Sequence, residues 1–447
     1  MFQSILIANR GEIASRIIKT CKQLNIKSVA VYSDPDEDSP YVEEADVAYP
    51  LGGSRVNESY LNMDKIFEIA KEAEVEAIHP GYGLLSENAS FARRCEEEGI
   101  TFIGPTPDVI EKMGSKLSAR KAMEEAGVPI IPGTNEPVET VDAAKEVANE
   151  IGYPVMVKAS YGGGGIGMEI VKSESELEKA IESNAHRAEQ FFGNGTLFIE
   201  KVIEDAHHVE IQVLGDHHGN AVHLYDRECS IQRRHQKVIE EAPSPLLTEE
   251  TRREMGEKAV QAVKSLGYRN AGTLEFLVDE DQNYYFLEMN TRLQVEHPVT
   301  EEITGIDLVE QQIRIASGEE LAINQGLVQI QGHAIEARIY AEDPKTFFPS
   351  PGTIEDLIIP KEEFIRNDQS IKKGFKITPF YDPMVAKLIV KGKDRNEAIS
   401  RLETALSMYK VEGIKTNIPL LLNIAANQAF QDGNTQTSFI QEHITNK

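Results

Sequence analysis

The sequence predicts a multidomain protein in which an α/β part is followed by an α+β part. Short apolar strands alternate with amphipathic helices in the first part of the chain, which is typical of a parallel sheet covered by helices. Long strand-like segments then follow one another with little helix between them, which is typical of an antiparallel sheet. The length of 447 residues suggests two to four domains of roughly 100–200 residues each.

Residues 1–112 form the predicted parallel part. Apolar strands are expected at "SILIA", "KSVAVYS", "EAIHPGYG" and "TFIGP", separated by helices such as "EIASRIIKTCKQL", "MDKIFEIAKEAE" and "ENASFARRCEEEG". A connecting helix, "SKLSARKAMEEAG", is expected within 113–132. Ser115 can cap its start, and Gly127 with Pro129 ends it.

Residues 133–203 are built around "YGGGGIGM" (161–168), which has five glycines in eight residues. Three of them match G-x-G-x-x-G, which is a weak signal alone. Strand-like residues lie on both sides, and a helix signal appears only at Ser173, where Glu176 completes a capping box. A strand–loop–strand arrangement would let glycine N–H groups approach an anion. The pattern therefore favours a phosphate-covering hairpin over a flexible linker or a dinucleotide loop.

Residues 204–330 hold the predicted antiparallel strands, and residues 331–447 form a last, mixed domain. The strands are expected at "HHVEIQVLGD", "NAVHLYDREC" and in the hairpin "AGTLEFLVDEDQNYYFLEMN", with a helix at "EETRREMGEKAVQAVKSLG". The last domain mixes strands such as "MVAKLIVKG" with helix-like segments near the end.

Composition excludes several classes of protein. The net charge is −27, which argues against nucleic acid or an anionic membrane as the main partner. Cys21, Cys95 and Cys229 lie far apart, which fits a reducing compartment and no metal cluster. The N-terminus lacks the features of a signal peptide, and no run approaches the ~20 apolar residues of a membrane span. A cytoplasmic protein is expected.

The hairpin "LEFLVDEDQNYYFLEMN" carries the strongest local signal for chemistry. If it folds symmetrically about Asp281 and Gln282, Glu275 pairs with Glu288. Like charges directly opposite each other destabilise a sheet. A cation such as Mg²⁺ between the two carboxylates would offset their repulsion and explain the pair. Asn290 could add an oxygen. The alternative is that both glutamates lie on a solvent-facing side of the sheet.

The segment "TRLQVEHP" follows at once. With a strand period of two, Arg292, Gln294 and Glu296 would share one side. A cation, an amide and a carboxylate there could bind and deprotonate a small oxyacid. A plain polar strand face is the alternative.

Basic residues in "QRRHQKV" form a candidate anion site in an acidic protein, and a solvated charged strand explains them equally well. Lys116 and Lys158 are candidate phosphate contacts, and His208 could hydrogen-bond a ligand. Lysine and histidine residues without such a role are common on protein surfaces, and this is the alternative for all three.

Seven segments together strongly resemble biotin carboxylases: "IANRGEIA", "HPGYGLLSEN", "FIGP", "MGSKLSAR", "KASYGGGGIGM", "RECSIQRRHQKVIEEAPSP" and "EMNTRLQVEHPVTE". Their order and spacing are family-like, and the similarity covers essentially the whole chain. The resemblance implies an ATP-grasp fold. Its parts would be an N-terminal α/β domain (1–112), a connecting helix (113–132), a mobile lid (133–203), a central antiparallel sheet (204–330) and a C-terminal domain (331–447).

The resemblance also implies the reaction and its residues. ATP would phosphorylate bicarbonate to carboxyphosphate, and the released carbon dioxide would carboxylate a biotin ureido nitrogen. The implied ATP contacts are Lys116, Lys158, Gly163, Gly164, Gly165, Glu200, Lys201, Ile203, His208, Gln232 and His235. The implied ligands of Mg²⁺ or Mn²⁺ are Glu275, Glu288 and Asn290, and the implied bicarbonate contacts are Lys237, Arg292, Gln294 and Val295. Glu296 would be the base, and Arg338 would stabilise the biotin enolate.

The chain departs from the family pattern at Ile166 and Glu169, where basic residues are usual. The glycines are intact, so the backbone cradle for phosphate would survive while the side-chain grip weakens.

No A-M-K-M biotin-attachment sequence occurs, so biotin is expected on a separate biotin carboxyl carrier protein. The resemblance implies a homodimeric component of acetyl-CoA carboxylase, or of another acyl-CoA carboxylase, that works with carboxyltransferase subunits. Two alternatives stay open: an ATP-grasp ligase that joins a carboxylate to an amine, and a catalytically idle scaffold.

Overall fold

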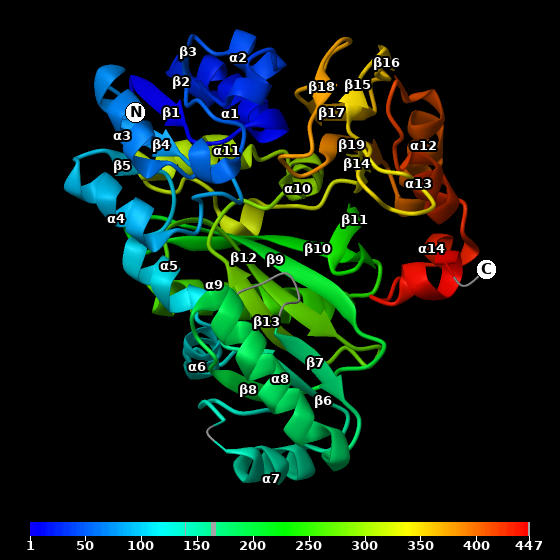
Figure 1. Cartoon of the computed structure of the whole chain (residues 1–447). Helices are drawn as coiled ribbons and strands as arrows, with labels where there is room; N and C mark the ends of the chain where they lie inside the picture. Colours follow the sequence, from blue (N-terminus) through cyan, green and yellow to red (C-terminus); the bar gives the residue numbers. More distant parts are fainter. Residues whose placement is uncertain (139, 162–166, 446–447) are drawn as a thin grey trace.

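The computed structural model describes residues 1–138, 140–161 and 167–445 (Figure 1). Its N-terminal part is a parallel five-stranded sheet in the order β3-β2-β1-β4-β5, as the alternating pattern predicts. The strands are β1 Ser4–Ile7, β2 Lys27–Tyr32, β3 Val47–Pro50, β4 Ala77–His79 and β5 Thr101–Phe102. The helices are α1 Gly11–Gln23, α2 Pro40–Glu44, α3 Met63–Glu72, α4 Ala89–Glu97 and α5 Pro107–Gly114.

These helices cover the sheet because each has one apolar stripe. In α1, Ile13, Ile17 and Cys21 recur every four residues and are buried. The connecting helix α6 spans Lys116–Glu125, and Ser115 caps it by accepting a hydrogen bond from the Ser118 N–H.

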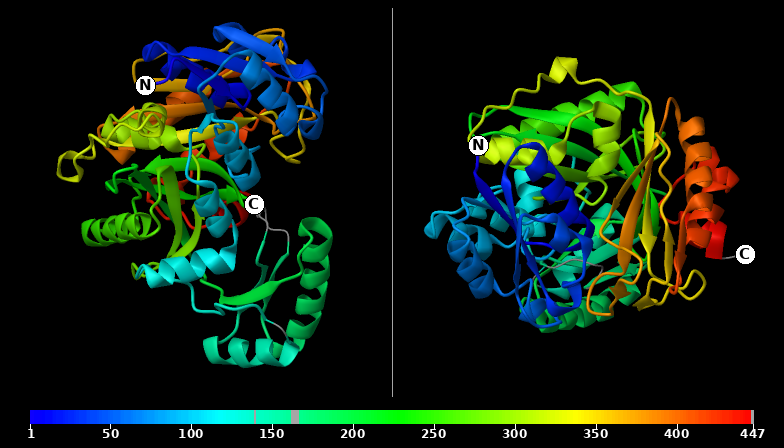
Figure 2. Two further views of the ribbon diagram at one scale, coloured as in Figure 1. Left: turned by 90° about the vertical axis from the view of Figure 1, so that its left-hand side faces the viewer. Right: turned by 90° about the horizontal axis from the view of Figure 1, so that it is seen from above.

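The strands on either side of the glycine segment belong to a separate unit that projects from the rest of the molecule (Figure 2). Its antiparallel sheet has the order β7-β6-β8, with β6 Val155–Ala159, β7 Met168–Val171 and β8 Leu197–Lys201. Two helices cover the sheet, α7 Val141–Ile151 and α8 Glu174–Phe192. The two strands predicted on either side of the glycines are confirmed, while residues 162–166 between them lie outside the described residues. The predicted capping box is wrong, because the Ser173 hydroxyl contacts Ser175 rather than a helix N–H.

An eight-stranded antiparallel sheet forms the middle of the molecule, in the order β13-β12-β9-β10-β11-β14-β19-β17. The strands are β9 His207–Gly215, β10 Ala221–Arg233, β11 Gln236–Ala242, β12 Asn270–Val278, β13 Tyr284–Asn290, β14 His333–Tyr340, β17 Ile365–Gln369 and β19 Met384–Gly392. The helices α9 Glu249–Ser265, α10 His297–Thr304 and α11 Leu308–Ala316 pack against it. The sheet runs across residue 330, and the domain boundary placed there stays a prediction.

The C-terminal part adds two small sheets and several helices to strands β14, β17 and β19. The remaining elements are β15 Gly352–Thr353, β16 Asp356–Ile358, β18 Lys376–Ile377, β20 Lys410–Glu412, α12 Arg395–Met408, α13 Ile418–Ala425, α14 Gln428–Gln431 and a π-helix at Ile440–Thr445. Helices α12 and α13 bury Leu402, Leu406 and Leu421 in its core. Among the described residues, no helix is both long and apolar enough to cross a membrane.

A buried ion cluster ties α12 to the central sheet. The Glu241 carboxylate accepts hydrogen bonds from Arg395 at 2.7 and 3.0 Å and contacts His333 Nε2 at 2.6 Å. Burial alone would raise the pKa of Glu241, but His333 and Arg395 outweigh it and lower the pKa to about 2.

Glu241→Gln should therefore lower the free energy of unfolding at pH 7 by about 3 kcal/mol, the linkage value of a shift from 4.5 to about 2. Since the folded-state pKa is depressed, this contribution is present above pH 4.5 and is lost as the pH falls toward 2. Urea unfolding at pH 7 and pH 3 measures it, with exposed Glu363→Gln as the control. A pH-independent difference would contradict the ionic origin.

Candidate active site

A cavity of about 1400 Å³ opens over one face of the central sheet, between the projecting unit and the N- and C-terminal parts. That volume exceeds the roughly 300–1,000 Å³ of a typical small-molecule pocket, so a nucleotide and a second ligand can share it. Sixteen sequence-predicted residues line it: Lys116, Lys158, Glu200, Lys201, Ile203, His208, Gln232, His235, Lys237, Glu275, Glu288, Asn290, Arg292, Gln294, Val295 and Arg338. Gly163, Gly164 and Gly165 lie outside the described residues.

Two glutamates face each other across the hairpin of β12 and β13. Glu275 pairs with Glu288 in the observed register, which confirms the predicted pairing. Glu275 is buried, while the Glu288 side chain is exposed in the open cavity. Desolvation by the surrounding walls and the charge of Glu275 both raise the pKa of Glu288. The pair therefore lines the cavity, which excludes the solvent-facing alternative.

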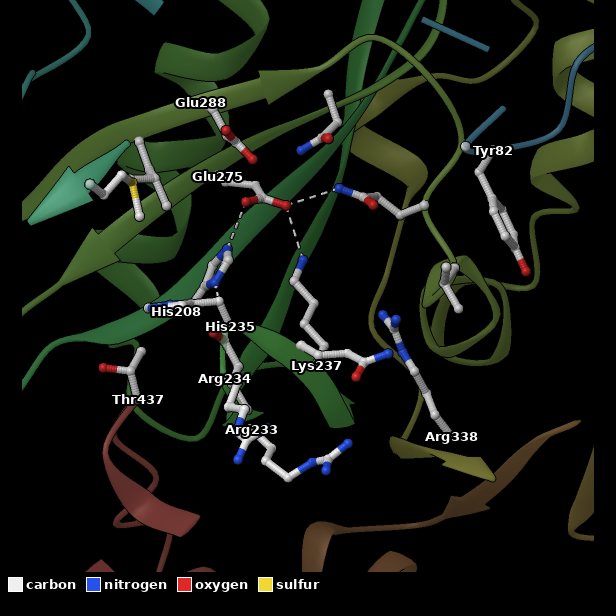
Figure 3. A pocket seen from close by; sticks show the side chains of 18 of the residues that line it. Tyr82, His208, Arg233, Arg234, His235, Lys237, Glu275, Glu288, Arg338 and Thr437 are labelled. Atoms are coloured by element: carbon white, nitrogen blue, oxygen red, sulfur yellow. Dashed lines mark hydrogen bonds and ion pairs between the residues drawn. The ribbon is translucent and has the colours of Figure 1, made fainter. Parts of the chain in front are cut away.

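The ammonium group of Lys237 is the hub of the buried charges, and Figure 3 shows its contact with Glu275. Its Nζ donates to Glu210 at 2.7 Å, to Glu275 at 3.0 Å and to Glu296 at 2.6 Å. Burial would lower the pKa of Lys237, but the acidic groups around it raise the pKa well above its usual value. The three carboxylates therefore surround a permanently charged lysine. A cluster of carboxylates that binds a metal would have no such cation at its centre.

Glu296 lies just behind the cavity wall, at the start of α10, and is fully buried. Lys237 and Arg338 cover it, since Arg338 Nη2 is 3.0 Å from Glu296 Oε2. Burial would raise the pKa of Glu296, but Lys237 and Arg338 hold it well below its ordinary value. Glu296 is therefore a carboxylate at neutral pH, and a ligand must pass between two cations to reach it.

The prediction of a strand at "TRLQVEHP" is wrong. Residues 291–296 are irregular, and α10 begins at His297. The predicted side chains still converge, because Arg292 donates to Gln294 Oε1 at 2.8 Å and Gln294 Nε2 donates to Glu275 at 3.0 Å. A bend, rather than strand alternation, brings them together.

The basic segment "QRRHQKV" is the turn of a hairpin rather than a continuous strand. Strand β10 ends at Arg233, Arg234 and His235 take positive φ values of 52° and 65°, and β11 begins at Gln236. Type I′ hairpins need this geometry, which few residues other than glycine and asparagine adopt easily. The turn places Arg233, Arg234, His235 and Lys237 along the cavity, where Arg234 and His235 are exposed and Arg233 and Lys237 are partly buried. A continuous charged strand is therefore excluded.

The projecting unit and α6 place two lysines on the opposite wall. Lys158 in β6 donates to Glu200 Oε2 at 2.7 Å, and Arg120 donates to Glu200 Oε1 at 2.5 Å. Lys116 is the first residue of α6 and lies near Lys158, and desolvation together with that charge lowers its pKa. Ile166 lies outside the described residues, and the Glu169 carboxylate accepts a hydrogen bond from Asn184 at 2.8 Å.

Sequence reasoning missed several residues that hold the site. Glu87 accepts hydrogen bonds from the Thr291 N–H and Arg292 Nε at 3.0 and 2.9 Å. Arg227 is fully buried and binds Glu210, which in turn binds Lys237. A usable signal existed for Glu210, since His208, Glu210 and Gln212 form a polar face on an otherwise apolar strand.

Comparison with known proteins decides the family. Residues 1–110 match the family model "Biotin carboxylase, N-terminal domain", and residues 336–442 match "Biotin carboxylase C-terminal domain". Residues 115–324 match "Carbamoyl-phosphate synthase L chain, ATP binding domain". The chain is 61% identical over 444 residues to biotin carboxylase 2 of Bacillus subtilis, covering 99% of this chain and 100% of that protein.

The chain belongs to the biotin carboxylase family. It is an ATP-dependent ligase with biotin carboxylase activity, and its predicted ATP-grasp fold is confirmed. This rules out the carboxylate–amine ligase and the idle scaffold.

Other relatives serve different carboxylases. A pyruvate carboxylase subunit of Methanothermobacter thermautotrophicus is 52% identical, over 99% of this chain and 90% of that protein. A solved biotin carboxylase domain dimer of Hydrogenobacter thermophilus 2-oxoglutarate carboxylase has a TM-score of 0.96 and 50% identity, over 99% of this chain and 98% of that one. That structure holds MgADP, ADP and bicarbonate.

Proposed function

We propose that this biotin carboxylase binds bicarbonate between Lys237, Arg292 and Gln294 and deprotonates it with Glu296. The observation that supports this is the position of the Glu296 carboxylate between Lys237 and Arg338. When a bicarbonate enters beside Lys237 and Arg338, these cations gain a new anionic partner in place of Glu296. As Glu296 gives up contacts to the cations, its pKa rises, which improves it as a base.

ATP is proposed to lie along the wall formed by the projecting unit, with its phosphates toward Lys116 and Lys158 and its base toward Glu200, Lys201 and Ile203. Lys158 already has an anionic partner in Glu200, so it is held in place before the phosphates arrive. His208, Gln232 and His235 are the proposed ribose and base contacts, and Gly163 to Gly165 the proposed phosphate cover.

The residues present fit a magnesium or manganese ion. Carboxylates of Glu275 and Glu288 and the amide oxygen of Asn290 are the hard oxygen ligands that Mg²⁺ prefers. Asn290 Oδ1 accepts from Arg292 at 2.9 Å and keeps a second lone pair. Bound there, the ion would neutralise charge on the transferred phosphoryl group. MgADP in the 2-oxoglutarate carboxylase relative supports this assignment.

Arg338 is proposed to stabilise the negative charge that develops on biotin. It extends from β14 toward the cavity opposite Glu288 (Figure 3). Arg338 Nη2 lies 3.0 Å from Glu296 Oε2 and 2.5 Å from Glu240 Oε1, so when Glu296 takes a proton Arg338 loses one of two anionic partners and can turn toward a new anion. Arg338 would therefore link the deprotonation of bicarbonate to the carboxylation of biotin.

Arg338→Gln should spare the slow bicarbonate-dependent ATP hydrolysis and lower biotin carboxylation about 10²–10³-fold, as loss of one oxyanion donor does. Both rates are measured with free biotin and compared with those of Arg401→Gln, which changes a partly exposed arginine of α12. A parallel loss of both activities in Arg338→Gln would instead place Arg338 in bicarbonate binding or in folding.

We further propose that the biotin arrives on a separate carrier protein and that the chain acts as a homodimer with the carboxyltransferase of acetyl-CoA carboxylase. The biotin carboxylase domain dimer of the 2-oxoglutarate carboxylase relative supports the homodimer. The test has two arms. ATP hydrolysis must depend on bicarbonate and rise with biotin, and chain purified from its own cells must yield malonyl-CoA when given acetyl-CoA. Carboxylation of pyruvate or 2-oxoglutarate alone would overturn the acetyl-CoA assignment.

A further inference from the structure

Lys387 is a fully buried lysine that no part of the proposed mechanism uses. It lies in the middle of β19, and none of its surface is exposed. Its Nζ donates to the Val295 carbonyl at 2.8 Å and is 3.2 Å from Glu12 Oε2. A buried ammonium is costly unless it is paired and hydrogen-bonded, so these two contacts account for its presence here.

Those contacts join three parts of the chain beneath the cavity. Lys387 comes from the C-terminal part, Glu12 from the first turn of α1, and Val295 from the irregular segment 291–296. An irregular segment has no ladder of strand hydrogen bonds to fix its peptide planes. Its geometry therefore depends on the side chains that hold its carbonyls from behind.

His297 holds the neighbouring carbonyl. Its Nδ1 is 2.8 Å from the Gln294 carbonyl, and because a carbonyl only accepts, Nδ1 carries the proton. His297 is fully buried, and burial together with Lys387 holds its pKa well below the usual value, so the ring is neutral. In a trans peptide the C=O of one residue and the N–H of the next point in opposite directions. With the Gln294 carbonyl fixed on the far side, the Val295 N–H is directed away from His297.

We propose that Lys387 and His297 are positioning residues that fix the two peptide planes at Val295 and so aim its N–H at bicarbonate. The inference rests on the proposed bicarbonate site, because Val295 lines the cavity beside Gln294 and Arg292. Neither positioning residue needs to touch the substrate. Their effect passes through the backbone that lies between them and the cavity.

Lys387→Met should raise the KM for bicarbonate about five- to tenfold, the scale of one weakened hydrogen bond, and leave the KM for ATP unchanged. Lys391→Met is the matched control. Lys391 lies four residues further along β19 on the same face and also donates to a carbonyl, that of Glu302 at 2.6 Å, at the far end of α10. It should change neither KM.

A second pair of variants keeps the test decisive if Lys387→Met fails to fold. His297→Leu removes the side-chain hydrogen bond to the Gln294 carbonyl and leaves only the longer one from the backbone N–H at 3.3 Å, so it should raise the KM for bicarbonate alone. His297→Asn keeps a side-chain N–H donor near the Nδ1 position and should restore the KM. Unchanged bicarbonate KM values, or parallel rises for bicarbonate and ATP, overturn the positioning role. Wild-type ATP hydrolysis that ignores bicarbonate overturns the proposed function as well, which separates the two failures.

Discussion

Glu296→Gln should strongly lower the rate of bicarbonate-dependent ATP cleavage and leave ATP binding intact. Loss of a general base typically costs ~10²–10⁴-fold in rate, and the amide has no basic oxygen to take the proton. The change is isosteric, so Lys237 keeps Glu210 and Glu275 as partners. Because Lys237 and Arg338 hold the pKa of Glu296 far below its ordinary value, the free wild-type enzyme should not lose this base by protonation between pH 5 and 8.

Single-turnover ATP cleavage at saturating bicarbonate measures the effect, and calorimetry with ADP checks that the nucleotide site survives. Glu302→Gln is the control, since Glu302 belongs to the same helix and its carboxylate contacts Arg366 at 3.4 Å, away from Lys237 and Arg338. Equal rates for Glu296→Gln and wild type would transfer the role of base to another group, for which Glu210 is the nearest carboxylate across Lys237.

Local patterns predicted the architecture because they act over short distances along the chain. Alternating apolar strands and helices predicted the parallel sheet, and the length of the β12–β13 hairpin predicted the partnership of Glu275 with Glu288. The predicted symmetry about Asp281 and Gln282 does not hold next to the turn, where Phe276 pairs with Phe286, and a β-bulge between Glu275 and Phe276 restores the Glu275–Glu288 pair. The partnership of these two like charges was therefore predicted from the sequence.

The errors arose where backbone geometry departs from its usual residue preferences. Arg234 and His235 at positive φ carry no glycine or asparagine signal, so nothing in "QRRHQKV" predicts a turn. Segment 291–296 alternates polar and apolar residues as a strand does, yet Lys387 and His297 hold it in a bend. Both side chains lie outside segment 291–296, and Lys387 is 92 residues from Val295 in the sequence. Reasoning from a single sequence cannot find a contact over that separation.

The charged residues that support the site from behind could not be predicted, for the same reason. Arg227 donates to Glu210, Gln212, Thr273 and Thr300, which come from two other strands and a helix. From the sequence it is one basic residue among 46. Only the folded sheet shows that it lies behind Lys237 and fixes the carboxylate that Lys237 binds.

Glu288→Gln should move activity and stability in opposite directions. Turnover should fall by orders of magnitude, since the change removes one carboxylate from the proposed metal site that neutralises the phosphoryl group. The folded protein should become more stable at neutral pH, because the like-charge contact with Glu275 disappears. Extra Mg²⁺ should recover part of the lost rate.

The sign of the pH dependence follows from the raised pKa of Glu288 in the folded state. A carboxyl with a raised pKa favours folding below its unfolded pKa and loses that contribution as the pH rises through the folded value. The stability gain of Glu288→Gln should therefore be largest at pH 7 to 8 and vanish below about pH 4.5, where wild-type Glu288 is also neutral. Melting temperatures across that range measure it, with exposed Glu280→Gln on the same hairpin as the control. Wild-type turnover at limiting Mg²⁺, with an unchanged melting temperature, would show that Glu288 neither binds the metal nor repels Glu275.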